Sequence, residues 1–497
     1  SEKTRADRID RLADGSVEVL VIGGGIVGAG IARDAAMRGL RVGLVEQCDF
    51  ASGTSSRTSR LLHGGLRYLA QGRLKLVYQA SHEKRILHRI ASHLADPLPF
   101  LFPTYRGTEW PLWKMRIGVK LYDLLCGGQN LGPSSGLGRD ATLGLLPGLA
   151  EKSLTGAVRY FDGLTNDARL TLDTLRSAVG HGAVAVNYCR VEEVVPGASG
   201  WIGHVRDLSS SGTGFQPVPD GLESRPTSGR VFQVRSRSVV NATGPWGSRL
   251  PQSRLQLRLT KGVHLVLDRI RLPVPDAVVM TDEGRILFAI PWGERVILGT
   301  TDTDYDGPIE AVRTEPADVA YILDIANRCF PKAGLTPADV LSSWAGLRPL
   351  LADKRGGPSD ISRAHSIAMG EPGWLDVAGG KLTTYRLIAE EAVDRLVAFL
   401  DVKAPRCATA QEPLLPSPDA TRGSAIVPPE PSAELVEHYC TREWAVHLAD
   451  VMIRRTSWHY YRKDRLELAD RVAGWMAGTL GWEPARLAAE QARYREE

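Results

Sequence analysis

The chain has few cysteines, and no two of them lie close together in the sequence. Six cysteines are spread over 497 residues, with no Cys-x-x-Cys among them. A structural zinc site would need clustered thiolates, and a disulfide framework would need a much denser set of cysteines. We therefore expect no metal site, and a reducing compartment fits this cysteine usage. The six are Cys48, Cys126, Cys189, Cys329, Cys407 and Cys440.

Long hydrophobic runs are also missing from the sequence. No stretch reaches the roughly 18 consecutive apolar residues that a membrane-spanning helix needs. The first residues, SEKTRADRIDRLADGS, are charged throughout and contain no apolar core of a secretory signal. We therefore expect a cytoplasmic protein that can still lie on a membrane surface.

The chain carries little net charge. Its 61 Lys and Arg residues exceed its 57 Asp and Glu residues by only four, and no concentrated basic stripe occurs. Nucleic acid is therefore not expected as a partner. The contents of 43% hydrophobic and 24% charged residues are those of ordinary globular proteins. The length predicts two or three domains.

What the sequence does contain is a nucleotide-binding motif near its start. Residues 17–22 form an apolar run typical of a buried parallel strand, and residues 29–38 continue with a helical pattern. Between them, Gly23, Gly25 and Gly28 give the spacing Gly-x-Gly-x-x-Gly. The first glycine allows a tight turn, the second lets the backbone approach a pyrophosphate, and the third lets helix and strand pack closely. The free N–H groups at the helix N-terminus then face the phosphates.

An acidic residue ends the next strand of this unit. The segment LRVGLVE runs to Glu46, which is placed to accept a hydrogen bond from a ribose hydroxyl. An acid there disfavours NADP and leaves FAD and NAD. Residues 238–246 form a second apolar strand ending in Ala-Thr-Gly-Pro-Trp, and residues 374–396 form a strand, a Gly-Gly turn and a long helix. A cofactor contacted from both ends of the chain has to be extended, which favours FAD.

Longer stretches carry a resemblance to a known family. They are VIGGGIVGAGIARDAAMRGL, ASGTSSRTSRLLHGGLRYL, NATGPW, KGVHLVL, IPWGERVILGTTDTDY, GLRPL, GGKLTTYR and EWAVHLADVMIRRTSW. Over residues 17–400 and again over 443–458, the chain resembles the FAD-dependent glycerol-3-phosphate dehydrogenases, which are respiratory and quinone-linked. The resemblance implies oxidation of sn-glycerol 3-phosphate to dihydroxyacetone phosphate, with FAD as cofactor and a membrane quinone as electron acceptor.

The resemblance also implies an α/β fold in three parts. These are a glutathione-reductase-type FAD-binding domain with a Rossmann-like parallel sheet, an antiparallel-sheet substrate domain, and a small helical C-terminal domain. The expected boundaries are 17–95, 155–255 and 345–400 for the FAD-binding domain, 96–154 and 256–344 for the substrate-binding domain, and 401–497 for a linker and the C-terminal domain.

Two features depart from that family. Residues 210–229 are a Pro/Gly/Ser-rich insert between two strand-like runs, which we expect to be a loop. The region after residue 400 is short for the family, and residues 404–432 form a proline-rich linker where the family carries more helix. Neither feature touches a motif residue, but both leave the contribution of the C-terminal domain to assembly open.

Cations in the matching stretches are the expected clamp for the substrate phosphate. A phosphate dianion favours arginine, whose charge is permanent and whose hydrogen bonds are bidentate. By resemblance, the substrate pocket contains Arg67, Tyr68, His264, Arg348, Arg363 and Lys381.

His264, Arg348 and Lys381 are the expected catalytic residues among these. Histidine has a suitable pKa for a general base, and His264 lies on a predicted strand of the substrate domain. Arg348 is an alternative, because it can stabilise the alkoxide. His63 is the other candidate for the base.

Turn residues of the matching stretches are expected to hold FAD. Gly64 and Gly65 are expected to let the backbone pass against the flavin, because a side chain at either position would fill the space that the ring needs. The expected cofactor-binding residues are Gly23, Gly25, Gly28, Glu46, Thr54, Ser55, Ser59, His63, Gly65, Leu66, Val191, Gly244, Gly380, Lys381, Leu382 and Thr383.

Residues 109–125, EWPLWKMRIGVKLYDLL, combine aromatic and basic side chains. From Pro111 onward they can form a helix with an apolar face, as in helices that lie in a membrane interface. Packing of that face on its own domain is the alternative. The resemblance favours peripheral contact with the inner face of the cell membrane, and it leaves a homodimer open. Residues 451–463 are a second basic and aromatic candidate.

Other activities stay open at this point. A glycerol-3-phosphate oxidase would share the pocket residues and pass electrons to O2. An amine-oxidising relative would share the fold, but a pocket with several cations disfavours it. A flavin-binding RNA-modification protein is disfavoured because the chain has no concentrated basic face.

Overall fold

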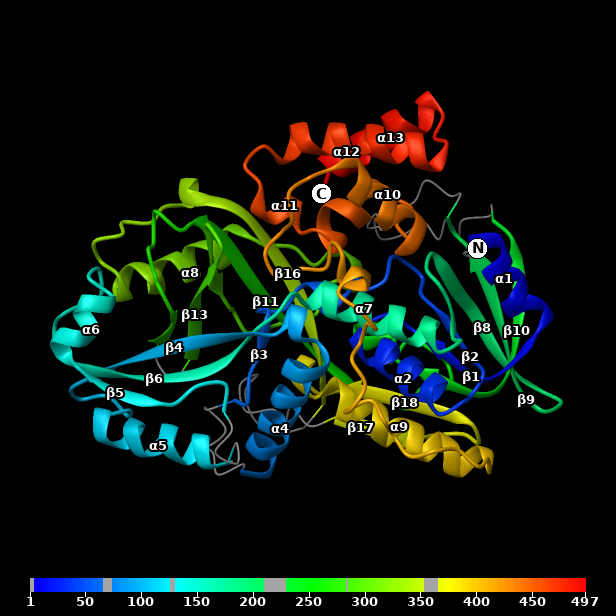
Figure 1. Ribbon diagram of the computed structural model, residues 1–497, viewed down its shortest axis with the longest axis horizontal. Coiled ribbons are helices and arrows are strands. Elements are labelled where there is room, and N and C mark those ends of the chain that lie inside the picture. The colour runs from blue at the N-terminus through cyan, green and yellow to red at the C-terminus, as the bar shows by residue number, and fades with distance from the viewer. Residues whose placement is uncertain (1–3, 66–73, 126–129, 210–228, 283–284, 353–364) are drawn as a thin grey trace.

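A computed structural model of the chain describes residues 4–65, 74–125, 130–209, 229–282, 285–352 and 365–497. Within these residues the strands form two sheets that lie side by side, and the helices of the C-terminal region lie across the top of both (Figure 1). The two sheets and the helical region confirm the expected α/β fold class.

The first sheet is built around β1, the strand of the nucleotide-binding motif. Its central strands are parallel, and the hairpin of β8 and β9 and the edge strand β17 add antiparallel pairs. In spatial order the strands are β17 (His365–Met369), β18 (Trp374–Gly379), β10 (Val231–Asn241), β1 (Ser16–Ile22), β2 (Val42–Val45) and β7 (Val184–Val186), with β8 (Cys189–Gly197) and β9 (Gly200–Asp207) beside β10.

Both faces of this sheet are buried, which explains the apolar run 19–22 of β1. Val19 and Val21 pack against α2 (Ile26–Met37), α7 (Asp167–Gly180) and α9 (Tyr385–Leu400). Leu20 and Ile22 point to the other face, toward α1 (Arg5–Asp14), β8 and β9. A strand covered on both faces shows no polar alternation. Residues 210–228 of the expected insert lie outside the described residues, and β9 and β10 on either side of it pair antiparallel.

The second sheet is mostly antiparallel. Its one parallel pair among the described strands joins β12 to β4. In order the strands are β15 (Thr303–Asp304), β11 (Leu257–Asp268), β14 (Arg295–Gly299), β13 (Arg285–Trp292), β12 (Ala277–Asp282), β4 (Asp96–Tyr105), β6 (Leu154–Leu164) and β3 (Leu61–Leu62), with β16 (Val340–Leu351) paired to β11 and β5 (Ser135–Gly138) to β6.

Helices cover both faces of the second sheet. α8 (Pro316–Cys329) and α6 (Arg139–Leu145) pack with Val296 and Leu298 of β14. Ile297 faces the other way, toward α4 (Leu74–Ile90) and α5 (Leu112–Leu125), which lie at the lower edge of the molecule in Figure 1. Successive side chains of β14 therefore point to opposite faces of the sheet, and both faces are covered by apolar side chains.

Three strands of the second sheet fall within the residues expected for the FAD-binding domain. They are β3, β6 and residues 345–351 of β16. β6 pairs with β4 along its whole length, and β16 pairs with β11 from Leu257 to Leu267. The apolar pattern of each strand is the same in either sheet, so only its pairing partner decides where it belongs.

The C-terminal region is a separate helical layer, as expected. Its helices are α10 (Ala433–Arg442), α11 (Trp458–Tyr461), α12 (Arg465–Leu480) and α13 (Pro484–Arg495), with a π-helical segment at Asp450–Arg455. They share a core of their own around Trp458 and Met476. No helix in the described part of the chain is long and apolar enough to cross a membrane.

Candidate functional site

A cavity of about 590 Å³ is lined by residues of both sheets. Its size lies within the range of small-molecule and cofactor sites. Its walls are formed by the turn after β1 and the end of β2, and by β11, β16 and the turn after β18. The lining segments are 22–27, 45–48, 52–63, 189–192, 242–251, 262–264, 346–350 and 377–383, with residues inside some segments not reaching the cavity.

The glycines of the nucleotide-binding motif leave no space for side chains. A Cβ on Gly23 would lie 2.5 Å from the carbonyl oxygen of Ala242, and its φ of +113° also favours glycine. A Cβ on Gly28 would lie 2.0 Å from the carbonyl oxygen of Gly23, so helix α2 rests directly on the turn. Gly25 is the N-cap of α2 and provides no side-chain cap, which leaves N–H groups at the helix start for a phosphate.

Glu46 is hydrogen-bonded to the same turn. Its carboxylate accepts from the N–H of Gly24 (2.6 Å) and from the N–H of Cys48 (2.9 Å), and it lines the cavity. Burial raises the pKa of this carboxyl, and these hydrogen bonds oppose that shift. A carboxylate has further lone pairs after two such bonds, so Glu46 can still accept from a ribose hydroxyl.

His264 lies on β11 and lines the cavity. Its Nε2 is 2.8 Å from the hydroxyl of Ser59, and its ring stacks on Trp344 at 5.2 Å. Its Nδ1 is buried and has no hydrogen-bond partner within the described part of the chain. A Cβ on Gly299, directly across the strand pair, would lie 2.3 Å from the histidine ring, so that glycine makes room for it.

Burial lowers the pKa of His264 to about 3, and the positive charges of Arg348 and Arg60 act in the same direction. The imidazole is therefore neutral at physiological pH. A neutral imidazole is the form that can accept a proton from a hydroxyl group.

This pKa predicts how stability depends on pH. Below about pH 6.5 the unfolded chain protonates this histidine, whereas the native chain does so only near pH 3, so the native state loses stability as pH falls. Between pH 7.5 and pH 5 the loss at this site is about 2 kcal/mol. We expect His264→Gln to remove that part of the pH dependence, measured as urea unfolding free energies at both pH values. The same pH dependence in both proteins would contradict the assignment.

Arg348 is anchored beside His264 by the loop after β14. Its guanidinium donates to the hydroxyl of Thr300 (3.0 Å) and to the carbonyl oxygen of Thr301, and it pairs with Asp302 at 3.1 Å. A Cβ on Gly262 of β11 would lie 2.3 Å from this guanidinium. Glycines inside strands mark such close approaches.

Lys381 reaches the cavity from the turn after β18. Residues 380–383 line the cavity, and the hydroxyl of Thr383 accepts from the N–H of His63 at 3.1 Å. That bond ties the late turn to the segment around His63, 320 residues earlier. An early and a late segment of the chain therefore meet at the cavity. The prediction of an extended cofactor, contacted by both segments, requires this.

Most of the expected site residues line the cavity, but some do not. Gly28 and Gly65 are described and are not among the lining residues, whereas Leu66, Arg67, Tyr68 and Arg363 lie outside the described residues. The lining members of the expected set are Gly23, Gly25, Glu46, Thr54, Ser55, Ser59, His63, Val191, Gly244, His264, Arg348, Gly380, Lys381, Leu382 and Thr383.

The expected role of Gly64 is wrong. Gly64 is not among the lining residues; a Cβ there would lie 2.3 Å from the hydroxyl of Tyr122 and 2.5 Å from that of Ser81. Its N–H donates to the Tyr122 hydroxyl at 2.9 Å. The glycine therefore makes room for α4 and α5. Gly65 has a φ of +80°, so the backbone conformation accounts for glycine there.

Three contributors to the site were missed by the sequence analysis. Trp344 stacks on His264, Arg57 lines the cavity and donates to the carbonyl oxygen of Ala345, and Trp246 lines the cavity near the end of β10. A tryptophan on a strand is indistinguishable from core in sequence. The glycines at 262, 299 and 346 were the available signal, because each lies within a strand and gives space to a neighbouring segment.

The cavity fits FAD. It joins a helix N-terminus whose glycines leave the backbone open, an acid at the end of the second strand, and a neutral histidine with an arginine close to it. A dinucleotide with a redox ring at one end needs these features in this order.

Comparison with known proteins agrees with this architecture. Residues 18–386 match the family described as FAD dependent oxidoreductase, and residues 412–487 match the C-terminal domain of alpha-glycerophosphate oxidase. The chain is 40% identical over 419 residues to the glycerol-3-phosphate dehydrogenase of Mycobacterium leprae, covering 83% of this chain and 68% of that protein.

Two solved structures are similar in fold. The glycerol-3-phosphate dehydrogenase of Bacillus halodurans, complexed with FAD, is 29% identical, with a TM-score of 0.77 over 99% of this chain and 96% of that one. The L-alpha-glycerophosphate oxidase of Mycoplasma pneumoniae, with FAD bound, is 17% identical, with a TM-score of 0.59 over 81% of this chain and 100% of that one, which supports the fold alone.

Fold and site together define the class of this protein as an FAD-dependent oxidoreductase. Within that class, the chain belongs to the glycerol-3-phosphate dehydrogenase family, and FAD is its cofactor.

Proposed function

We propose that this protein oxidises sn-glycerol 3-phosphate to dihydroxyacetone phosphate and passes the electrons through FAD to a membrane quinone. The observation that carries the proposal is that His264, Arg348 and Lys381, from three separate strands and turns, line the same cavity. One neutral base and two cations suit a small anionic polyol.

Each of these residues has a proposed role. The Nδ1 of His264 has no partner among the described residues, so it can receive the proton of the substrate 2-hydroxyl. The positive charge of Arg348 stabilises the negative charge that develops on that oxygen. Thr300 and Asp302 hold the guanidinium in place for this role. His63, which also lines the cavity, is the alternative base.

The substrate phosphate is proposed to bind Lys381 together with Arg67, Tyr68 and Arg363, of which the last three lie outside the described residues. FAD supplies the hydride acceptor when it is bound. The protein supplies the position of the substrate, the proton acceptor and the compensating charge.

The direct test is anaerobic addition of glycerol 3-phosphate to the purified FAD-bound protein. We expect the oxidised flavin absorbance to bleach within the dead time of manual mixing. Glycerol without its phosphate should leave the absorbance unchanged at the same concentration, because it offers no dianion to the cations. An unbleached flavin with glycerol 3-phosphate would refute the proposed substrate.

The electron acceptor is a separate prediction. We expect a soluble quinone analogue to reoxidise the reduced enzyme much faster than O2 does, with little hydrogen peroxide released in air. The alternative is an oxidase with the same substrate, and the match of residues 412–487 to an oxidase domain keeps this alternative relevant. Stoichiometric peroxide release, measured with a coupled peroxidase, would favour the oxidase.

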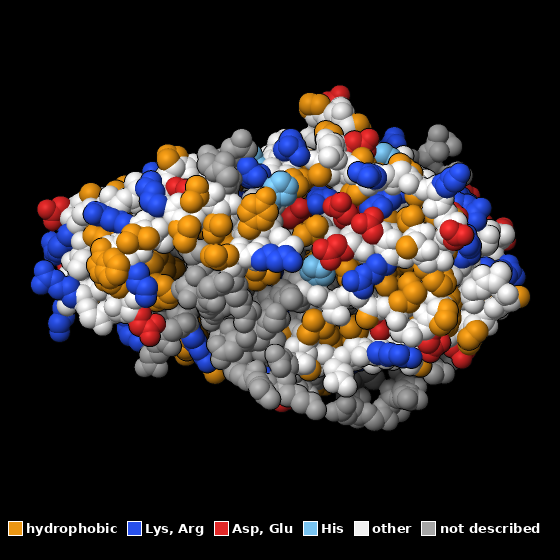
Figure 2. Space-filling model, turned by 90° about the horizontal axis from the view of Figure 1, so that it is seen from below, with side chains coloured by type: hydrophobic (Ala, Val, Ile, Leu, Met, Phe, Trp, Pro, Cys, Tyr) orange, Lys and Arg blue, Asp and Glu red, His pale blue; other side chains and the backbone are white. Residues whose placement is uncertain are grey.

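Contact with the membrane surface is proposed to use α5. Met115, Val119 and Tyr122 bury one face of this helix, and four large apolar side chains on the other face are exposed. These are Trp113, Ile117, Leu121 and Leu124. Apolar side chains gather on the side of the molecule that carries α5, seen from below in Figure 2.

Basic side chains accompany this stripe. The spacing of 113, 117, 121 and 124 places the four on one face of the helix. Lys114, Arg116 and Lys120 are exposed on the same helix. An apolar stripe with cations is what a helix lying in an anionic membrane interface presents.

Replacing Trp113 and Ile117 by serine should weaken membrane binding. Each side chain contributes about 1.5–3 kcal/mol when it leaves water, so the double variant should lose at least about tenfold in affinity. Co-sedimentation with phosphatidylglycerol vesicles measures this loss. Ile270→Ser is the matched control, because Ile270 is an isolated apolar side chain with 82% exposure on a turn of the second sheet. Equal binding by the double variant and the control would exclude α5.

A further inference from the structure

The C-terminal helical layer contacts the segment that follows the ribose-binding strand. Glu46 lines the cavity at the end of β2, and Asp49 lies three residues further on. Asp49 is only 1% exposed, although it is charged and belongs to a turn. A buried carboxylate needs hydrogen-bonding cations, and here they come from the other end of the chain.

Two consecutive arginines of the π-helical segment hold Asp49. Arg454 donates its Nε to the carboxylate, and Arg455 binds the same carboxylate through both terminal nitrogens. Asn187 adds a fourth donor at 3.0 Å. π-helical segments are rare and occur frequently at functional sites.

A second buried carboxylate completes this cluster. Asp450 accepts from Arg454 (2.6 Å), from the hydroxyl of Tyr188 (2.6 Å) and from the N–H groups of residues 446 and 447. Arg454 therefore bridges Asp49 and Asp450 within one layer of buried charge. Two carboxylates and two guanidinium groups balance one another.

The segment between Glu46 and Asp49 is also hydrogen-bonded to residues 188 and 189, next to this cluster. The N–H of Tyr188 donates to the carbonyl oxygen of Cys48, and the N–H of Cys189 donates to that of Glu46. The N–H of Ala51 donates to the carbonyl oxygen of Gly24 in the phosphate turn. Residues 46–51 are thereby hydrogen-bonded to the turn after β1 through Ala51 and to the two arginines through Asp49.

Aromatic packing supports the same connection. Phe50 is fully buried, and its ring meets Trp444 of the C-terminal layer edge to face at 5.3 Å. A Cβ on Gly24 would lie 2.5 Å from the Phe50 ring. Phe50 thus packs between the C-terminal layer and the phosphate turn, the turn that follows β1 and contains Gly24.

We propose that Arg454 and Arg455 are positioning residues for FAD, so that docking of the C-terminal layer determines how tightly the cofactor is retained. Neither arginine is among the cavity-lining residues, and both act through Asp49 on the segment that carries Glu46. The C-terminal layer is then a part of the cofactor site as well as a cover on the two sheets.

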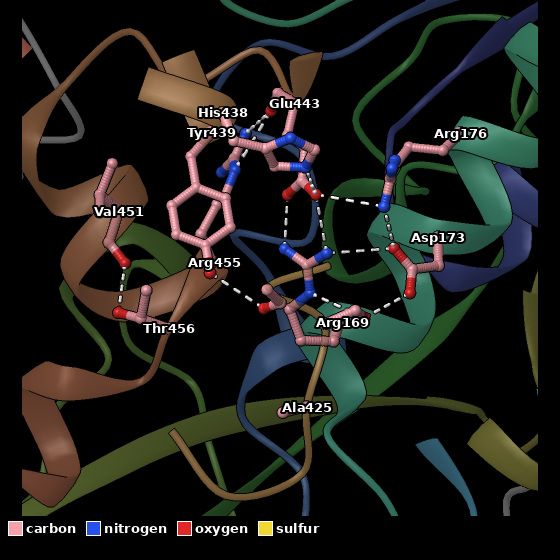
Figure 3. A network of polar contacts seen from close by, with 12 residues as sticks. Arg169, Asp173, Arg176, Ala425, His438, Tyr439, Glu443, Val451, Arg455 and Thr456 are labelled. Atoms are coloured by element: carbon pink, nitrogen blue, oxygen red, sulfur yellow. Dashed lines mark hydrogen bonds and ion pairs between the residues drawn. The ribbon is translucent and has the colours of Figure 1, made fainter. Parts of the chain in front are cut away.

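A second ionic network provides a control, because it fixes the same layer without reaching the cavity. Arg169 of α7 binds Glu443 through two nitrogens and Asp173 at 3.1 Å, and Arg176 and His438 add to the cluster (Figure 3). Arg455 also donates to the carbonyl oxygen of Glu443 in this view. The hydrogen bonds of Arg454 go to Asp49 and Asp450, which makes Arg454 the cleaner test.

The experiment compares Arg454→Met with Glu443→Gln. Apoprotein is titrated with FAD by flavin fluorescence to obtain Kd, and thermal unfolding of each apoprotein is recorded. We expect Arg454→Met to raise Kd at least tenfold and Arg454→Lys to restore it to within about threefold of the unsubstituted protein. Arg454→Met and Glu443→Gln should lower the Tm by similar amounts. Glu443→Gln, however, should change the Kd for FAD less than twofold.

A purely structural role would move Tm alone. An unchanged Kd in Arg454→Met, or an equal rise in Kd in both variants, would overturn the proposal. If Arg454→Met fails to fold, Arg454→Gln decides by the same criterion, because its amide keeps a donor near the position of the arginine Nε and removes the charge and the terminal donor to Asp450.

Discussion

Replacement of Arg348 by alanine is expected to lower kcat/KM for glycerol 3-phosphate by about 10²–10³-fold while FAD stays bound. Hydrogen bonds to a charged group contribute about 1.5–3 kcal/mol each, and loss of two of them near the lower end of this range accounts for a factor of this size. The Thr300 hydroxyl and the Asp302 carboxylate hold Arg348 before substrate arrives, so little reorganisation is required on binding.

Steady-state kinetics with a quinone analogue measures this effect, and the flavin content of the purified variant shows that the cofactor is retained. Arg258→Ala is the matched control. Arg258 lies on β11, the strand that pairs with β16, but its guanidinium is directed to Asp304 at the surface. We expect its kcat/KM to stay within about twofold, because exposed ion pairs contribute little. A normal kcat/KM in Arg348→Ala would remove Arg348 from the mechanism.

Replacement of Gly28 by alanine is expected to produce a protein that retains almost no FAD. The added methyl group would lie 2.0 Å from the carbonyl oxygen of Gly23, so either the helix or the turn has to move. Both are backbone, and overpacking of this kind costs about 1–3 kcal/mol or more. Because the displaced atoms form the phosphate turn, much of that cost falls on cofactor binding, and we expect at least about a tenfold rise in Kd.

The ratio of flavin to protein absorbance after purification reports the loss directly, and FAD titration of the apoprotein quantifies it. Gly180→Ala is the control, because Gly180 ends α7 with nothing within 4 Å of the position of a new Cβ. Alanine there should preserve flavin content and slightly raise stability. A Gly28→Ala protein with full flavin content would show that the helix can move away from the turn without affecting the site.

The nucleotide-binding unit was predictable because it is local. The apolar strand, the three glycines and Glu46 occupy about thirty consecutive residues, and each requirement follows from backbone geometry within that span. The same reasoning does not predict which sheet β3, β6 and the end of β16 join, because a strand pattern indicates which face is apolar and does not identify the neighbouring strand.

Gly64 shows a second way in which sequence reasoning is incomplete. A glycine pair indicates that something approaches the backbone closely, but the approaching group was taken to be the cofactor, and it is the hydroxyl of Tyr122. Trp344 shows the converse case, in which a residue that resembles core packs on the expected base.

The sequence by itself determined the class of cofactor and the strand, turn and helix of the nucleotide-binding unit, because short spacings encode these elements. The tertiary structure alone decided that His264, Arg348 and Lys381 line one cavity, and that Arg454 reaches Asp49 across 405 residues. These contacts depend on strand register and on the docking of the C-terminal helices, which are set by packing between segments far apart in the chain.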